Sequence, residues 1–569
     1  MGQSISKPKR FCLVLIKPSH YDDDGYVIQW FRSPIPSNSL AVLYGLAQEC
    51  AQTRELGEDV TIDIHALDEG NIRVKVGKIA ALIEDAGSGM VMLVGVQSNQ
   101  FPRAIDIARP LRERGIQVAV GGFHSSGVAA MLGGRDRDLE LATSLGVSIF
   151  AGEVEGRMAQ LLRDAYAGQL AQVYDFMNDL PGIAGSGVPF LPASVIRRTI
   201  GQVTTFDAGR GCPYQCSFCT IINVQGRKSR HRSPDDVEKI IRANRKQGVG
   251  AFFITDDDFA RNKNWEPILD RLIDLNEMEF GDNTFTIQVD TMCHKIPNFI
   301  EKCARAGVRR VFIGLENIRP ANLLGAKKRQ NKIGEYRKML LAWKKAGVMT
   351  YCGYIIGFPN DTIETIEHDV EILKKELPID VVEFFNLTPL PGSEDHLNLV
   401  KQGRAMEPDL NQYDLNHVTT GHALMSQDEW RRAYRLAWER FYTYEHIETV
   451  LRRGLVTFEQ MPAMVHLLTW FKGSYALEDL HPLECGVIRL KFRRDRRPGL
   501  PLESILDFYP RFVVGTLLKL FRWGAVFFRI RWTLYWLARE PEVRNYSDPA
   551  LSEVNDDDDT AALQLFKAS

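Results

Sequence analysis

The chain has 569 residues, with 70 basic and 72 acidic side chains and a formal net charge of −2. A chain of this length is too long for one hydrophobic core and predicts about three domains. Its near-neutral charge argues against the basic surface that nucleic-acid-binding proteins need, so we expect no nucleic-acid partner. The hydrophobic fraction of 45% and the charged fraction of 25% are those of a soluble globular protein.

The N-terminal sequence shows no secretory signal, and no apolar run reaches the roughly 18 residues of a membrane-spanning helix. Six of the nine cysteines are dispersed, mostly in apolar contexts, which predicts free thiols and a cytoplasmic location. The first six residues, MGQSIS, fit the pattern for N-myristoylation, but this short pattern requires a eukaryotic host. We expect residues 1–10 to be disordered.

Residues 11–170 alternate between apolar runs and amphipathic segments. The first run, FCLVLI, has the continuous hydrophobicity of a buried parallel strand. The predicted strands cover residues 11–16, 60–67, 89–96, 116–122 and 147–153. Strands alternating with helices in this way predict a doubly wound, Rossmann-like parallel sheet. Ligands of such sheets bind at the carboxyl ends of the strands.

Residues 171–203 are rich in glycine and proline and are predicted to form a linker. Residues 204–400 then repeat the alternation of strands and helices. The first predicted strand of this domain begins at residue 204. Five further predicted strands cover residues 251–258, 284–290, 308–316, 349–358 and 381–392. Six strands, each but the last followed by a helix, predict a partial (β/α)6 barrel with its chemistry at the carboxyl ends of the strands.

Three cysteines fall within eight residues just after the first strand of this second domain. Cys212, Cys216 and Cys219 have the spacing C-x3-C-x2-C. A structural zinc site or a fully ligated iron-sulfur cube needs four ligands, so three thiolates leave one metal position open. Nearby Gly209 and Gly211 allow the backbone to approach an inorganic core closely. The alternatives are a zinc site or three unrelated thiols.

The segment GRGCPYQCSFC, with Phe218 before the third cysteine, resembles the signature of the radical S-adenosylmethionine (SAM) enzymes. The resemblance implies that Cys212, Cys216 and Cys219 bind three irons of a [4Fe-4S] cluster and that SAM chelates the fourth. In that family an electron from the cluster cleaves SAM and releases a 5′-deoxyadenosyl radical. The resemblance also implies that Phe218 contacts SAM and that flavodoxin or ferredoxin donates the electron.

Later strand ends resemble the SAM-binding segments of the same family. In TDDDF, Thr255, Asp256 and Asp257 lie at the carboxyl end of the second predicted strand, where the resemblance implies acceptors for the methionine ammonium group. The alternative is that these acids only cap the next helix. The resemblance also implies that Glu316 contacts the ribose and that Gly357 lines the adenine.

Two loops of the first domain resemble the cobalamin-binding domain that precedes many radical SAM enzymes. They are GGFHS, residues 121–125, and GEVEG, residues 152–156. The expected cobalamin contacts are Gly121, Gly122, His124, Gly152, Glu153 and Glu155. The D-x-H-x-x-G motif that places a histidine on cobalt is absent, because His20 lacks its spacing and His65 lies within a predicted strand. We therefore expect no histidine on cobalt. The alternative is a domain that has lost its corrinoid or binds another ligand.

Residues 401–500 predict a helical extension, with a long helix from about Gln427. Its Tyr413, His417 and His422 are candidate substrate contacts, although structural roles are favoured. Within residues 501–545, the segment 507–540 mixes apolar and aromatic side chains with six basic ones, which is typical of helices in a membrane interface. Packing on the protein's own surface is an equal alternative. Residues 546–569 are expected to be an acidic, disordered tail.

Together these features predict a cobalamin-dependent radical SAM methyltransferase acting on an unactivated carbon of a small molecule or lipid. In such enzymes one SAM yields the radical, and a second methylates cobalamin. One alternative is a radical cyclase, oxidase or rearrangement enzyme with the same two domains. Another is a non-catalytic iron-sulfur or corrinoid-binding protein at a membrane. Neither the substrate nor a catalytic side chain follows from any motif.

Overall fold

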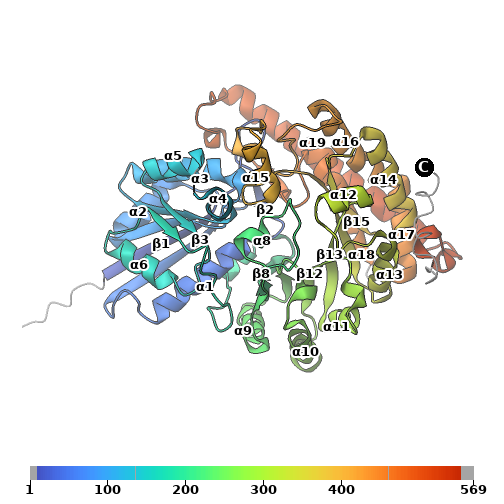
Figure 1. Cartoon of the computed structure of the whole chain (residues 1–569), viewed down its shortest axis with the longest axis horizontal. Helices are drawn as coiled ribbons and strands as arrows, with labels where there is room; N and C mark the ends of the chain where they lie inside the picture. Colours follow the sequence, from blue (N-terminus) through green and yellow to red (C-terminus); the bar gives the residue numbers. More distant parts are fainter. Residues whose placement is uncertain (1–8, 135, 459–460, 553–569) are drawn as a thin grey trace, which may run out of the picture.

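The computed structural model describes residues 9–134, 136–458 and 461–552. Its two six-stranded parallel sheets lie next to each other, and the helices of the C-terminal extension pack beside the second sheet (Figure 1). The MGQSIS motif and the acidic run at residues 555–559 lie outside the described residues.

The first sheet has the strand order β3-β1-β4-β5-β6-β7. Its strands are β1 (Lys9–Lys17), β3 (Val60–Asp68), β4 (Gly89–Leu93), β5 (Gln117–Gly121), β6 (Ser148–Ala151) and β7 (Val173–Asp175). Alternate residues of β1 face opposite hydrophobic cores: Phe11, Leu13 and Leu15 pack toward helix α1 (Asn38–Gln52), and Cys12, Val14 and Ile16 toward α2 (Val76–Ala86) and α3 (Phe101–Arg112). Burial on both faces explains the unbroken apolar run, and the doubly wound sheet is confirmed.

Three details of the N-terminal part differ from the sequence-based expectation. β1 begins at Lys9, inside the segment expected to be disordered. β7 lies in the segment predicted to be a linker and adds a sixth strand, which its three-residue length concealed. Strand β2 (Gln29–Arg32) lies between β1 and α1, where no strand was predicted, and pairs antiparallel with β16 (Val487–Leu490). The C-terminal extension is therefore joined to the N-terminal domain.

The second sheet has the order β15-β14-β13-β12-β11-β8, and every pair is parallel. Its strands are β8 (Val203–Phe206), β11 (Ala251–Ile254), β12 (Thr284–Val289), β13 (Val308–Glu316), β14 (Met349–Ile356) and β15 (Val381–Asn386). The helices between them include α9 (Pro234–Arg245), α10 (Trp265–Leu275), α11 (Phe299–Ala306), α13 (Tyr336–Lys345) and α14 (Ile363–Glu376). β8 and β15 form the two edges, so the partial (β/α)6 barrel is confirmed.

The C-terminal extension is mainly helical, as predicted. Helix α16 (Gln427–Phe441) packs against α14 and β15, and α17 (Tyr444–Thr457) and α18 (Met461–Gly473) continue it. The last long helix, α19 (Ile505–Leu537), packs against α17 and α18. Among the described helices, none combines the length and the hydrophobicity needed to cross a membrane.

A buried ion pair links α13 to the start of β15. Lys344 contacts Asp380, both side chains are at most 1% exposed, and Asp380 also accepts a hydrogen bond from the Thr350 amide at 2.8 Å. Replacing Lys344 with Met leaves Asp380 buried without its cation, so we expect the free energy of unfolding to fall by roughly 3–5 kcal/mol. Urea unfolding measures this. The exposed neighbour provides the control: Lys345→Met should change stability by less than about 0.5 kcal/mol, and equal effects of the two variants would contradict the prediction.

Candidate active site

The three cysteines lie on a tight loop that leaves the short strand β9 (Gly209–Arg210). Gly211 has a φ of +87°, and a Cβ there would lie 2.5 Å from the Lys228 carbonyl oxygen, so only glycine fits. The Cys212 amide donates to the Gly226 carbonyl at 3.2 Å. These constraints hold the start of the loop against the segment that follows it.

The thiols of this loop are free and close together. Cys216 is buried, whereas Cys212 and Cys219 are partly exposed. Burial raises the pKa of Cys212 and of Cys219 to about 12, and backbone amides of Tyr214 and Ile221 oppose this by donating to the two sulfurs. Amides directed at sulfur, together with three thiols on one loop, fit an iron-sulfur cluster held by thiolates.

Two side chains that follow β13 in the sequence lie near the cysteines. Lys328 brings a positive charge and Gln330 a hydrogen-bond donor. The Gln330 amide nitrogen lies 3.6 Å from the Cys216 sulfur. The Lys328 ammonium lies near Cys216 and Cys219 and forms an ion pair with Glu316. Glu316 has a φ of +63°, an uncommon conformation for a non-glycine residue, at the carboxyl end of its strand. The structure therefore places Glu316 beside the cysteine loop and links the two through Lys328.

Asp256 supports the backbone that leads into the cysteine loop. Its Oδ1 accepts hydrogen bonds from the amides of Ala208 and Gly209, both at 2.7 Å, and its Oδ2 accepts one from Asn262 Nδ2 at 2.8 Å. Both carboxylate oxygens are thus occupied by protein donors. Binding of the SAM ammonium by Asp256 stays a prediction, and the geometry favours a supporting role.

Asp257 is the acid of this segment that lines the cavity described below. Burial raises its pKa to about 7, the Asp256 charge adds to the shift, and a hydrogen bond from the Gly211 amide opposes it. Thr255 lines the same cavity, and its hydroxyl donates to the Phe206 carbonyl at 3.3 Å. Asp257 therefore joins the cysteine loop to the cavity.

Asp258 and Asp290 form a pair of acids, and Asp290 contacts Tyr214 in the middle of the cysteine loop. The Tyr214 hydroxyl donates to Asp290 Oδ2 at 2.9 Å, and Arg261 forms an ion pair with Asp290. Asp258 accepts a hydrogen bond from the Asp290 amide at 3.3 Å, and burial beside Asp290 raises the pKa of Asp258. Neither Tyr214 nor Asp290 was predicted from the sequence, although a tyrosine within the motif and an acid at a strand end are signals for such a pair.

Phe218 and the segment after β14 lie close together, as expected for one SAM site. The Phe218 and Phe358 rings are 6.4 Å apart in an edge-to-face arrangement. Gly357 has a φ of +104°, and a Cβ there would lie 1.9 Å from the Trp430 ring. Glycine is therefore required where α16 covers this segment.

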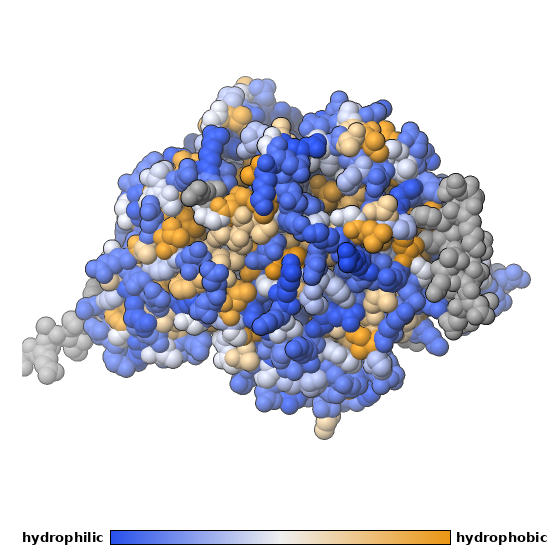
Figure 2. Space-filling model, in the orientation of Figure 1, coloured by the Kyte–Doolittle hydropathy of each residue, from blue (hydrophilic) through white to orange (hydrophobic). Residues whose placement is uncertain are grey.

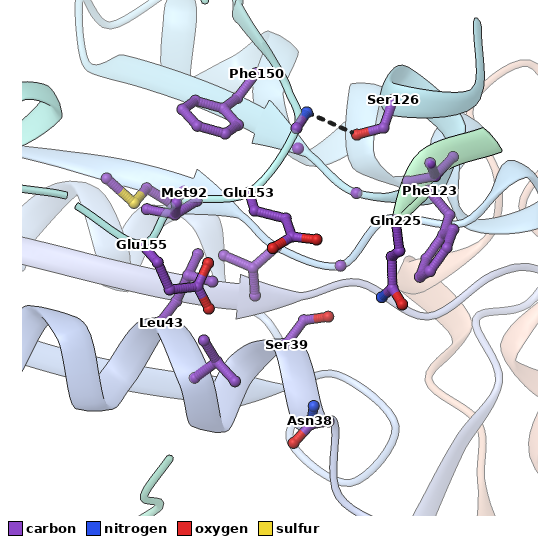
Figure 3. A pocket seen from close by; sticks show the side chains of 18 of the residues that line it. Asn38, Ser39, Leu43, Met92, Phe123, Ser126, Phe150, Glu153, Glu155 and Gln225 are labelled. Carbon is purple, nitrogen blue, oxygen red and sulfur yellow. Dashed lines mark hydrogen bonds between the residues drawn. The ribbon is translucent and has the colours of Figure 1, made fainter. Parts of the chain in front are cut away.

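A cavity of about 280 Å³ lies between the carboxyl ends of the first sheet and the start of the barrel (Figure 3). On the face shown in Figure 2, hydrophobic side chains gather over this junction, near α4 (Phe123–Leu132) and α8 (Ile221–Val224). The first domain lines the cavity with, among others, Asn38, Ser39, Leu43, Met92, Phe123, Phe150 and Gly152. The barrel lines it with Arg210, Ile221, Val224, Gln225, Thr255 and Asp257.

Glycines form the part of this cavity that belongs to the first sheet. Gly122 has a φ of +150°, and a Cβ there would lie 2.2 Å from the Val96 nitrogen. Gly152 has a φ of +108°, and its amide donates to Ser126 Oγ at 3.0 Å. Gly121 also lines the cavity, beside Phe150. A wall without side chains at these positions fits a large, flat ligand such as a corrin ring.

His124 does not line the cavity, although the sequence analysis expected it to contact cobalamin. It is buried in α4, with Nδ1 at 3.2 Å from Ser98 Oγ and its ring centroid 4.4 Å from that of Phe101. His65 lies in β3, as predicted. Among the described residues that line the cavity, none is a histidine. The absence of a histidine ligand on cobalt stays a prediction.

Glu153 and Glu155 point toward the cavity (Figure 3) and pair with arginines of the barrel. Arg210 binds Glu153 at 2.8 Å and Glu155 at 2.5 Å, and Arg230 binds Glu153 at 2.5 Å. Arg210 also binds Asp207 at 2.9 Å. We call these five residues the arginine clamp. The structure thus gives both glutamates a partner in the other domain, which the sequence analysis did not foresee.

The family model described as the radical SAM superfamily matches residues 208–373, which contain the cysteine loop and the strand ends described above. Residues 208–373 therefore form a radical SAM domain. The family uses a [4Fe-4S] cluster and SAM, and the three thiols and their surrounding donors fit that cluster.

The curated relatives match only part of this chain. It is 27% identical to bacteriochlorophyllide d C-8(2)-methyltransferase of Chlorobaculum tepidum, over 57% of this chain and 72% of the relative. It is 23% identical to hopanoid C-2 methylase of Rhodopseudomonas palustris, over 47% of this chain and 54% of the relative. It is also 27% identical to anaerobic magnesium-protoporphyrin IX monomethyl ester cyclase of Rubrivivax gelatinosus, over 34% of each chain.

Two solved structures share the fold. The radical SAM methyltransferase TsrM of Kitasatospora setae, solved with tryptophan and a SAM analogue, matches with a TM-score of 0.53 and 16% identity, over 69% of this chain and 76% of that one. The cobalamin-dependent radical enzyme OxsB, solved with aqua-cobalamin, matches with a TM-score of 0.51 and 14% identity, over 98% of this chain and 84% of that one.

Removing the Asp256 carboxylate tests its supporting role. Asp256→Ala leaves two buried amides without an acceptor, at roughly 1–3 kcal/mol each, so we expect less iron and sulfide per chain and at least about tenfold less 5′-deoxyadenosine. Asp274→Ala, an exposed acid on α10, is the control and should behave like the wild type. Wild-type iron content combined with a raised KM for SAM would instead assign Asp256 to the SAM ammonium.

Proposed function

We propose that this enzyme is a cobalamin-dependent methyltransferase that methylates an unactivated carbon of a small molecule or lipid. The observation that carries the proposal is the cavity between the two sheets. Its glycine wall belongs to the domain that resembles cobalamin-binding domains, and its opposite wall contains Asp257 beside the cysteine loop. A corrinoid and the SAM site would therefore share one opening, as methyl transfer after radical formation requires.

Each part of the site has a task in this reaction. When bound, the cluster supplies the electron that cleaves SAM, received from a donor such as flavodoxin or ferredoxin, and cobalamin supplies the methyl group. Cys212, Cys216 and Cys219 hold the cluster, and Glu316 and Asp257 offer acceptors near it. The arginine clamp keeps the two walls of the cavity facing each other. Trp430 covers the Gly357 segment and shields it from water.

The relatives' names support methyl transfer, because they include a bacteriochlorophyllide methyltransferase and a hopanoid methylase. We propose a substrate of the same classes, a bacteriochlorophyllide-like or a hopanoid-like molecule. The second candidate is radical ring closure, which the cyclase relative favours. The two reactions differ in their products, since only methyl transfer converts SAM to S-adenosylhomocysteine.

Product analysis tests this proposal directly. With cobalamin, reductant and a cell extract as the substrate source, the wild type should form both 5′-deoxyadenosine and S-adenosylhomocysteine, and Cys216→Ala should form neither above background. Cys303→Ala, which alters a buried thiol of α11, is the matched control and should retain both products. Formation of 5′-deoxyadenosine without S-adenosylhomocysteine would favour the cyclase alternative, and the absence of both products from the wild type would favour a binding protein.

We also infer that α19 lies on an anionic membrane surface. One stripe of the helix packs on the protein through Phe508, Val526, Ile530, Leu534 and Leu537. The exposed stripe repeats at helical spacing and comprises Leu506, Tyr509, Val513, Leu517, Phe521, Phe528, Trp532 and Trp536. Phe521 is 77% exposed and Phe528 65%. An exposed apolar stripe of this length is unusual for a surface that faces only water.

The charges on α19 also fit contact with an anionic membrane surface. Within the described part of the chain, Arg522 and Arg531 form no ion pair, and both are exposed beside the apolar stripe. Basic side chains that flank an apolar helix face attract anionic lipid headgroups. A membrane-bound enzyme would meet a lipid-soluble substrate at the bilayer, which agrees with the proposed substrate character.

Liposome flotation tests the membrane contact. The double variant Phe521→Asp, Trp536→Asp should lose most of its binding to vesicles that contain anionic lipid, because it places two charges in the apolar face. Met278 is 85% exposed on the barrel, so Met278→Asp is the matched control and should float like the wild type. Equal flotation of both variants would contradict the assignment.

A further inference from the structure

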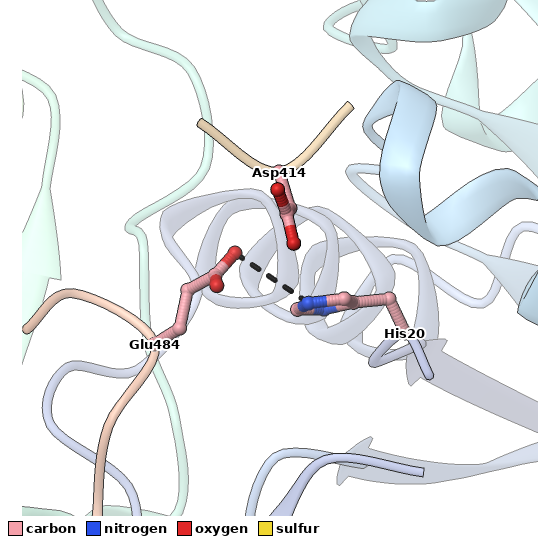
Figure 4. Close-up of side chains that lie close together, drawn as sticks. All are labelled: His20, Asp414 and Glu484. Atoms are coloured by element: carbon pink, nitrogen blue, oxygen red, sulfur yellow. Dashed lines mark ion pairs between the residues drawn. The ribbon is translucent and has the colours of Figure 1, made fainter. Parts of the chain in front are cut away.

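Three side chains that could bind a metal ion converge outside the cavity between the sheets (Figure 4). His20 follows β1 in the first domain, Asp414 lies in the segment after the barrel, and Glu484 lies in the C-terminal extension just before β16. One ligand atom from each lies within 4.8 Å of the other two. The cluster therefore forms where three separate parts of the chain meet.

His20 and Asp414 are buried, Glu484 is partly exposed, and two atoms of the three residues lack partners. His20 is 4% exposed and Asp414 5%. His20 Nε2 lies 3.7 Å from Glu484 Oε1, which is longer than a hydrogen bond. Among the residues that the structure describes, neither His20 Nε2 nor Glu484 Oε2 has a hydrogen-bond partner. Buried polar atoms are almost always paired, so these two point to a missing ligand.

The backbone around the cluster is held in place by other contacts. The Tyr21 amide donates to Asn411 Oδ1, and Asn411 Nδ2 donates to the Tyr21 carbonyl, both at 2.9 Å. Trp30 Nε1 donates to the Glu484 carbonyl at 2.9 Å. Asp414 Oδ1 accepts the His417 amide at 3.1 Å. These contacts hold the backbone that carries the three side chains, and the contact to Asp414 also orients a proposed ligand.

We propose that His20, Asp414 and Glu484 bind one divalent first-row metal ion, with Zn²⁺ as the best match. One imidazole and two carboxylates suit zinc, iron or manganese, whereas calcium prefers six to eight oxygens and magnesium keeps several waters. Three protein ligands leave a coordination position for water or for an oxygen atom of the substrate.

Charged side chains of both signs surround the three candidate ligands, among them Asp22, Lys17 and Arg489. A neighbouring cavity of about 230 Å³ shares Asp414 with the three candidate ligands, and both acidic and basic side chains line it.

This site is separate from the two cofactor sites described above. None of its three residues lines the cavity between the sheets or belongs to the cysteine loop. The proposal therefore does not depend on the proposed methyl transfer. A bound ion would link the loop after β1, the segment that follows the barrel and the C-terminal extension.

Zinc titration of the full chain tests the proposal. The thiols of the cysteine loop would compete for zinc. The titration therefore uses a background in which Cys212, Cys216 and Cys219 are all replaced by Ser. This background should bind one Zn²⁺ per chain, measured by competition with a chelating dye. His20→Asn and Glu484→Gln, which nearly preserve side-chain shape, should each weaken binding by about 100-fold or more. His65→Asn, a partly buried histidine in β3, is the matched control and should leave the affinity unchanged.

Thermal unfolding gives an independent readout. Zinc should raise the unfolding temperature of the background and of His65→Asn, but not of His20→Asn or Glu484→Gln. If His20→Asn does not fold, Glu484→Gln alone decides. The proposal would be overturned if the triple-serine background bound no zinc. It would also be overturned if folded His20→Asn and Glu484→Gln bound zinc as tightly as the background does.

Discussion

The arginine clamp is the interaction on which the arrangement of the two sheets depends. Arg210 and Arg230 leave the barrel beside the cysteine loop and pair with Glu153 and Glu155 at the end of β6, and all four side chains are at most 14% exposed. Buried ion pairs add little net stability compared with well-packed apolar side chains. Their geometry is directional, however, and it turns the carboxyl ends of both sheets toward one cavity.

That orientation explains why the chemical groups of two domains converge. Parallel sheets place their loops at the carboxyl ends of the strands, so two sheets that face each other at these ends enclose a space lined by loops from both. The glycines of the first sheet keep one wall free of side chains, and Asp257 brings the other wall to the cysteine loop. The C-terminal extension completes the assembly, since Trp430 lies over Gly357 and β16 pairs with β2.

Sequence reasoning succeeded where the signal was local. The unbroken run in β1 and the strand-helix alternation predicted both sheets, and β13 was predicted with its observed bounds. The cysteine spacing with its glycines predicted the thiol loop. β7 and β2 were missed because strands of three or four residues carry almost no periodic signal, and β2 forms its ladder with a strand more than 450 residues away along the chain.

The roles of individual acids were the least predictable part, because a carboxylate's role depends on the donors that surround it. Asp256 and Asp257 are adjacent in the sequence, yet one accepts three protein hydrogen bonds and the other lines the cavity. His124 comes two residues after Gly122 but turns into the protein interior, toward Ser98 and Phe101. The same limit applies to His20, Asp414 and Glu484, which nothing in the sequence connects. Only the docking of the extension on both other domains brings these three side chains together.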